Sequence, residues 1–125
     1  MNTAYPPADA ILAALWALWN RESVDQEDPN FSATGDLADG RVTVTVSGEV
    51  DMASAEALYR AATPDRAEAA TLDLRAVTFF DSAAIHTLIR LAERYPGALE
   101  VVPSDRVRRI LEISGLGQQA WLRPA

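Results

Sequence analysis

Residues 70–94 read ATLDLRAVTFFDSAAIHTLIRLAER, a run in which the spacing of the apolar residues changes half-way along. At its start, Leu72 and Leu74 alternate with polar residues, and this period of two predicts a β-strand. After a short bend and the pair Phe79-Phe80, the apolar positions follow the i, i+3, i+4, i+7 spacing of an amphipathic helix: Ile85, Leu88, Ile89 and Ala92. The stretch therefore predicts a strand, a turn and a helix in succession.

Asp81 and Ser82 stand at the predicted start of that helix. Either side chain can accept a hydrogen bond from the free amides of the first helical turn. A helix N-terminus favours a negative charge by roughly 0.3–1 kcal/mol, so a phosphate carried by the Ser82 hydroxyl would be tolerated in the free protein.

The composition is that of one globular domain: 125 residues, 49% hydrophobic and 23% charged. The absence of cysteine excludes disulfides, thiol catalysis and thiolate metal sites, and a lone histidine, His86, excludes a multi-histidine metal site. We therefore expect no metal and no cofactor. A net charge of −7 argues against nucleic-acid binding. Because no basic n-region precedes an apolar stretch at the N-terminus, a cytoplasmic protein is expected.

Residues 1–30 are expected to form an apolar helix followed by an acidic linker. Residues 10–19 are apolar without interruption and include Trp16 and Trp19, which are costly to leave in water. Ten helical residues reach only about 15 Å, so no membrane span is predicted. We expect this helix to pack on the domain or against a second copy, which would give a homodimer. Residues 21–30 are acidic, end in Pro29-Asn30 and are typical of a solvated linker.

Residues 31–125 alternate between strand and helix patterns. The sequence predicts a turn at Asp39-Gly40, a helix capped by Asp51 and a helix capped by Ser104 that stops at Gly115. The expected strands and helices beyond 70–94 are strands at 31–34, 42–46, 99–102 and 120–122, and helices at 55–62 and 105–114. This alternation predicts a sheet with helices packed over it.

Three pieces of the chain have the residues and the spacing of a known family. They are Gly48-Glu49-Val50-Asp51, the run from Leu72 to Ser82, and the run from Pro103 to Leu116. Together they resemble the STAS domain of bacterial anti-sigma factor antagonists, over about residues 31–122. The resemblance implies an α/β (α+β) fold, a single STAS-like domain at 31–125 with a mixed four- to five-stranded sheet and helices mainly on one side. The N-terminal helix is additional to it.

The resemblance also implies a function, that of a non-enzymatic regulator that works by partner switching. In the family, the unmodified antagonist binds an anti-sigma factor that is itself a serine kinase of the histidine-kinase ATPase type. The kinase phosphorylates the serine after the aspartate, the complex dissociates, and a phosphatase resets it. In this sequence that serine is Ser82. The expected partner-binding residues are Glu49, Asp51, Asp81, Ser82, Ala83 and His86.

The sequence departs from the family where glycines usually follow the serine, because Ala84 and His86 occupy those positions. Added side chains there are expected to obstruct a kinase cleft, which leaves slow phosphorylation with intact binding, or a kinase matched to this surface. The family also tends to continue into a further C-terminal helix. We expect the N-terminal helix to cover the apolar surface that this further helix would have covered.

Other interpretations remain open from the residues alone. Ser82 and Asp51 can be plain helix caps. A Ser-His-Asp hydrolase using His86 is disfavoured, since the Gly-x-Ser-x-Gly pattern and an oxyanion loop are missing. The alternative functions are a STAS subunit of an ABC-type transport complex, docking on its ATPase subunit without phosphorylation, and a stress-signalling scaffold.

Overall fold

The computed structural model of this chain describes residues 30–124. The predicted apolar helix at 10–19, its homodimer and its role as a cover for the domain all lie outside the described residues. Along the part that is described, no helix has the length and apolar character needed to cross a bilayer.

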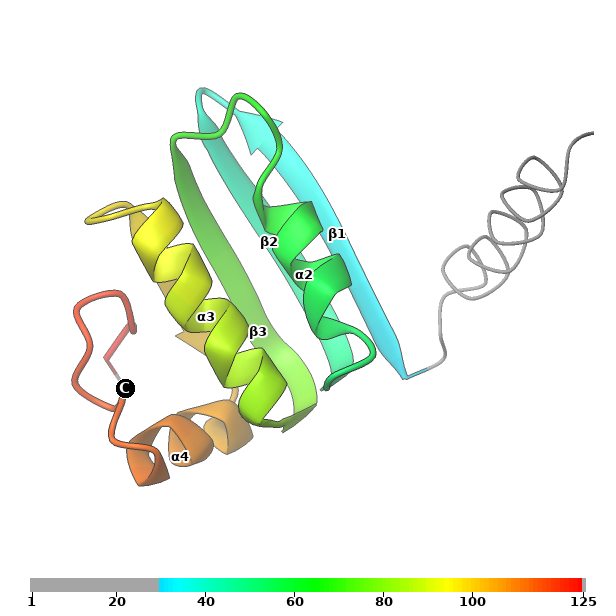
Figure 1. The fold of residues 1–125 in the computed structure, drawn as a ribbon, viewed down its shortest axis with the longest axis vertical. Coiled ribbons are helices and arrows are strands. Elements are labelled where there is room, and N and C mark those ends of the chain that lie inside the picture. The colour runs from blue at the N-terminus through cyan, green and yellow to red at the C-terminus, as the bar shows by residue number, and fades with distance from the viewer. Residues whose placement is uncertain (1–29, 125) are drawn as a thin grey trace, which may run out of the picture.

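A mixed four-stranded sheet and three helices make up the described chain, as the sequence predicts (Figure 1). The strands are ordered β1-β2-β3-β4; β1 is antiparallel to β2, whereas β3 is parallel to both of its neighbours. The elements are β1 (Phe31–Ala38), β2 (Arg41–Val50), α2 (Ala55–Ala62), β3 (Ala69–Phe80), α3 (Ser82–Arg94), β4 (Leu99–Pro103) and α4 (Asp105–Ile113).

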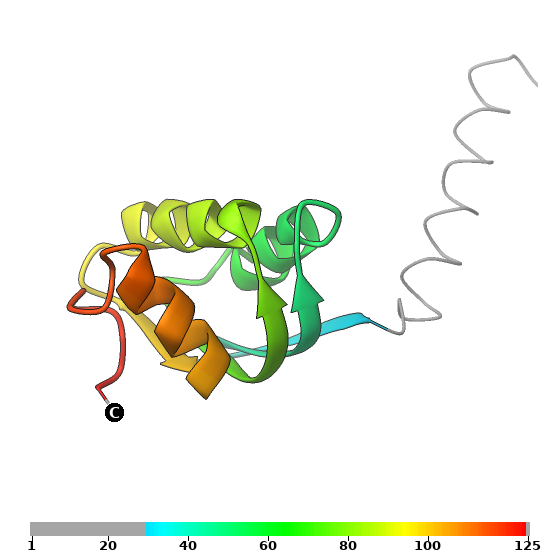
Figure 2. The ribbon, with the colours of Figure 1, turned by 90° about the horizontal axis from the view of Figure 1, so that it is seen from below.

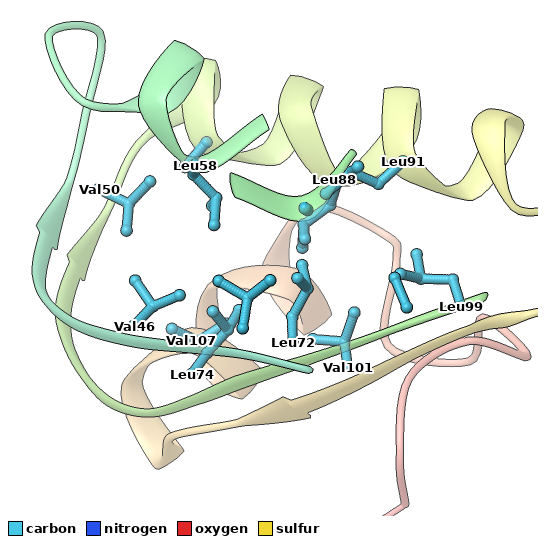
Figure 3. Packing of buried hydrophobic residues seen from close by; sticks show 14 of the residues in the cluster. Val46, Val50, Leu58, Leu72, Leu74, Leu88, Leu91, Leu99, Val101 and Val107 are labelled. Atoms are coloured by element: carbon cyan, nitrogen blue, oxygen red, sulfur yellow. The ribbon is translucent and has the colours of Figure 1, made fainter. Parts of the chain in front are cut away.

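The helices lie on one face of the sheet (Figure 2). The strand pattern explains why: Val42, Val44 and Val46 of β2 are buried, while Thr43 and Thr45 between them are exposed. The inner face meets leucines of α2 and α3, and α4 adds Val107 to the same cluster (Figure 3). Burying each such side chain stabilises the fold by roughly 1.5–3 kcal/mol, so this one-sided core holds the layers together.

The hairpin of β1 and β2 turns at Asp39-Gly40, as predicted, with φ values of 53° and 80°. The edge strand is longer than the expected 31–34, because it pairs with β2 from Phe31 opposite Gly48 to Ala38 opposite Arg41. Its own residues, FSATGDLA, carry few apolar side chains, so the pairing partner rather than the local sequence extends it.

No break interrupts β3 before Phe79, in contrast to the predicted bend. The strand is continuous from Ala69 to Phe80, and its register against β2 shifts twice, between Thr45 and Ser47 and between Gly48 and Glu49. Each shift leaves an extra residue on β3, as in a β-bulge. In place of the expected bend, β3 therefore has two irregularities in its pairing with β2.

The buried stripe of α3 is rotated from the predicted one. Ala84, Thr87, Leu88 and Leu91 are its buried residues. Ile85 and Ala92 are partly buried, and Ile89, predicted in the core, is 38% exposed. Ala84, at the start of the helix, therefore belongs to the core in place of Ile89.

The C-terminal part matches the sequence in its caps and differs in its last strand. The Ser104 hydroxyl accepts from the Val107 amide at 3.2 Å, and Gly115, with φ 83°, follows α4 as its stop. Residues 120–122 do not form the predicted strand. They contribute a single parallel bridge, between Leu122 and Val101 of β4.

Candidate partner-binding site

Two neighbouring parallel strands end together at one edge of the sheet. Val50 of β2 pairs with Phe80 of β3, and both strands end there. The Asp81 amide donates to the Val50 carbonyl at 3.2 Å, which ties the start of α3 to the end of β2. Asp51 and Asp81, thirty positions apart in sequence, therefore follow adjacent strand ends (Figure 1).

Asp81 is the residue that caps α3. Its backbone is extended, and its Oδ1 accepts from the Ala84 amide at 3.1 Å. Ser82 is the first residue of the helix and is exposed, and within residues 30–124 no hydrogen bond is formed by its hydroxyl. The cap and the free hydroxyl are thus divided between two adjacent residues, and the interpretation of Ser82 as a plain cap is wrong.

Asp51 caps a turn rather than α2. Its Oδ1 accepts from the amides of Ala53 at 3.0 Å and Ser54 at 3.2 Å, and α2 begins after Ser54. The predicted helix cap is therefore displaced to the turn that leads into the helix. Its carboxylate is half-buried and held in place at the edge of the sheet.

Ser54 supports this loop and was not anticipated from the sequence. It is buried, its hydroxyl donates to the Glu49 carbonyl at 3.0 Å, and the same oxygen accepts from the Asp51 amide at 3.0 Å. The spacing Asp51-x-x-Ser54 was a signal of a side-chain-stabilised turn. The loop after β2 is accordingly held by its own polar groups.

Other exposed side chains lie in the segments that end β2 and β3 and begin α3. Glu49 and His86 are exposed, and Ala83 is half-buried. Two large apolar side chains were missed by the sequence reasoning: Met52, 81% exposed, and Phe79, 44% exposed and paired in register with Glu49. We name this region the junction surface, made of Glu49, Asp51, Met52, Phe79, Asp81, Ser82, Ala83 and His86.

The acidic groups of the junction surface do not form a metal site. Over the described range 30–124, no group of three or more histidine, aspartate or glutamate side chains is arranged to hold a metal ion. The carboxylates of Asp51 and Asp81 instead accept from backbone amides, which is a structural use of their charge.

A family model described as "Mlab, STAS domain" matches residues 33–124. The chain belongs to the STAS domain family. The resemblance drawn from the three sequence pieces is confirmed, and so is the fold class that it implied. A comparison with curated proteins finds no match.

Solved structures similar to this STAS domain are anti-sigma factor antagonists. One, from Mycobacterium paratuberculosis, is 31% identical, with a TM-score of 0.65 over 78% of this chain and 89% of that one. SpoIIAA in its unphosphorylated form is 22% identical, with a TM-score of 0.57 over 75% and 88%. Bacillus SpoIIAA in the phosphorylated form is 20% identical, with a TM-score of 0.55 over 75% and 91%. The two SpoIIAA structures are likenesses of fold.

The structure separates the two positions at which this STAS domain lacks the usual glycines. Ala84 is fully buried, and its methyl group packs in the core beneath α3. His86 is exposed. The expectation that both side chains obstruct a partner is therefore wrong for Ala84, and of the two usual glycine positions only that of His86 changes the junction surface.

Proposed function

We propose that this STAS domain is an anti-sigma factor antagonist that acts by partner switching. In its unphosphorylated form the junction surface binds an anti-sigma factor that is also a serine kinase of the histidine-kinase ATPase type. Phosphorylation of Ser82 releases that partner, and a phosphatase restores the binding form. The observation that carries the proposal is the exposed Ser82 hydroxyl at the start of α3, which has no hydrogen-bond partner among the described residues and directly follows the capping residue Asp81.

The charge of a phosphoryl group explains the release. Phosphorylation adds about −1.5 to −2 charges and three acceptor oxygens. On Ser82 this charge would stand among Glu49, Asp51 and Asp81, and a partner packed over it would bury like charges together. The core is unaffected because the modified side chain is exposed, so the domain switches its partner without refolding.

The apolar side chains of the junction surface supply the attraction in the unmodified state. Met52 and Phe79 expose large apolar area at the same edge as Ser82. Buried apolar anchors ringed by polar groups are typical of protein interfaces. The comparison with antagonists of known structure supports this role, and SpoIIAA has been solved in a phosphorylated form. In this role the chain is a substrate of the kinase and catalyses nothing itself.

The experiment is incubation of the full chain with the candidate kinase and ATP, followed by intact mass measurement. The wild type and a Thr78→Ala variant, which removes another exposed hydroxyl near the end of β3, should each gain one phosphoryl group. Ser82→Ala should gain none. No gain in the wild type would remove the phosphorylation switch, and a gain in Ser82→Ala lost in Thr78→Ala would move it to Thr78.

A second candidate function is binding without phosphorylation, as a STAS subunit of an ABC-type transport complex or of a stress-signalling scaffold. Two observations favour this second function. His86 is exposed one helical turn after Ser82, and the description of the matching family model includes the name Mlab. Capture experiments with the products of neighbouring genes discriminate the candidates. A sigma factor and a kinase support the antagonist, whereas an ATPase and a permease whose binding ignores ATP support the transport subunit.

We further propose that the chain forms a homodimer through residues 10–19. The apolar run with Trp16 and Trp19 supports this, because the described domain already buries one contiguous core without it. The large exposed apolar side chains of residues 30–124 come from separate segments of the chain: Leu37, Met52, Phe79, Ile89 and Ile113.

A further inference from the structure

His86 lies one helical turn beyond Ser82 on α3, and both side chains are exposed. Residues four apart on a helix are neighbours, with Cβ atoms about 5–6 Å apart. Helical side chains also lean toward the N-terminus of their helix, so the imidazole leans over the turn that begins with Ser82. A group added to the Ser82 hydroxyl would therefore be within reach of the ring.

Among the charged side chains of the loop after β2 and of α3, His86 is the neighbour of Ser82 suited to an anion. On the loop side, Glu49 and Asp51 carry carboxylates, and Asp81 precedes Ser82 directly. Arg90 lies a further turn along α3, where it pairs with Glu56 of α2 at 3.2 Å and stacks 3.8 Å from the centre of the Tyr59 ring. Its guanidinium is thus already engaged away from the helix start.

We propose that His86 binds the phosphoryl group of phosphorylated Ser82 in the released protein. The inference rests on the proposed phosphorylation. The protonated ring donates an N–H to a phosphoryl oxygen, a charge-assisted bond stronger than a neutral one. The order, anion first and cation four residues later, is the favourable one on a helix.

The consequence is a phosphorylated state with its own internal partner. The phosphate turns along α3, away from Asp51 and Asp81, and its dianion is stabilised by the imidazolium. The released form is therefore held by a contact of its own, against the opposing charges of Glu49, Asp51 and Asp81.

The test uses the full chain with phosphoserine placed at position 82 by genetic code expansion, so that no kinase is needed. The ³¹P resonance is titrated with pH in the parent chain and in His86→Gln. We expect the midpoint of the phosphoserine titration to be lower with His86 present by about 0.2–0.4 pH unit. Because the chain has one histidine, its C2–H resonance reports the same pairing without assignment.

Arg90→Gln is the matched control, since it removes a positive charge one turn farther along α3. Its midpoint should remain that of the parent. Equal midpoints with and without His86 would overturn the inference, as would an equal displacement in Arg90→Gln, which would indicate the general field of the protein. Failure of the proposed function is separate, because it appears as a missing mass gain with kinase and ATP.

Discussion

Tyr95, the residue that follows α3, joins two helices through a single hydroxyl. Its side chain is 1% exposed, and its hydroxyl donates to the Ala62 carbonyl at the end of α2 at 2.7 Å. Burial raises the pKa of Tyr95 above its ordinary value. The fold therefore favours the protonated phenol.

We predict that Tyr95→Phe lowers the free energy of unfolding by about 1–2 kcal/mol at neutral pH, because the buried Ala62 carbonyl loses its donor. Urea unfolding measures this. Tyr59→Phe is the control, since no hydrogen bond of the Tyr59 hydroxyl is found in the described chain, and it should change stability little.

The same variant has a predicted pH dependence. A folded-state pKa above the unfolded value gives stability that is complete below about pH 10 and is lost as the pH rises through the raised pKa. Melting curves of the wild type and Tyr95→Phe should therefore converge at alkaline pH. A constant difference between them up to the alkaline limit would contradict this assignment.

Among the strands and helices, the start of the edge strand β1 depends on Gly48 of β2. Its φ is 88°, and a Cβ built there would collide with the carbonyl oxygen of Asn30, which accepts from the Glu49 amide. Gly97 also has a positive φ, 71°, but a Cβ there would meet nothing within 4 Å. Substitution of Gly97 therefore tests only the cost of a positive φ. Substitution of Gly48 adds the cost of the collision with Asn30.

We predict that Gly97→Ala costs about 1–2 kcal/mol, from the left-handed conformation alone. Gly48→Ala should cost more, because the backbone at Asn30 must shift and the start of β1 must loosen. Chemical denaturation measures both, and amide exchange in β1 locates the change. Equal costs at the two positions would show that the contact with Asn30 is unimportant.

The cap of α3 gives a second prediction at this scale. Asp81→Ala should lower the free energy of unfolding by about 1 kcal/mol, because the Ala84 amide loses its acceptor. Asp81→Asn retains an acceptor oxygen and should keep stability within a few tenths of a kcal/mol. Thermal unfolding compares them, and a stable Asp81→Ala would assign the cap to another group.

At the scale of the whole molecule, residues 10–19 are expected to contribute to assembly or to stability. We predict that deleting residues 1–22 converts a dimer into a monomer, or lowers the melting temperature if the segment packs on its own domain. Light scattering after size exclusion and thermal unfolding measure these. A truncated chain unchanged in both mass state and melting temperature would refute both roles for the segment.

The features that could be predicted from the sequence are those set by residues close together in the chain. The alternation of Val42, Val44 and Val46 predicts a strand buried on one face. Ser104 and Gly115 mark the start and the end of α4 through interactions within a few residues. The errors lie where a distant element intervenes. Ile89 is exposed because of how α3 sits on the sheet, and the end of the chain forms one bridge instead of a strand.

The candidate site divides in the same way. Asp81, Ser82 and the helix that they begin could be predicted, because a change of apolar period and a capping residue are visible within a few positions. Met52, Phe79 and Ser54 could not, since their exposure or burial depends on which strand ends meet. The sequence by itself determined the order of strands and helices, from local periodicity. It indicated the family and the position of the serine through three pieces that resemble STAS domains.

Only the tertiary structure decided that the Asp51 loop lies beside Ser82, that Ala84 points into the core and that His86 remains at the surface. The reason is physical: these relations depend on hydrogen bonds between parallel strands and on burial against residues far away in the chain. Neither interaction leaves a signal in the neighbouring sequence.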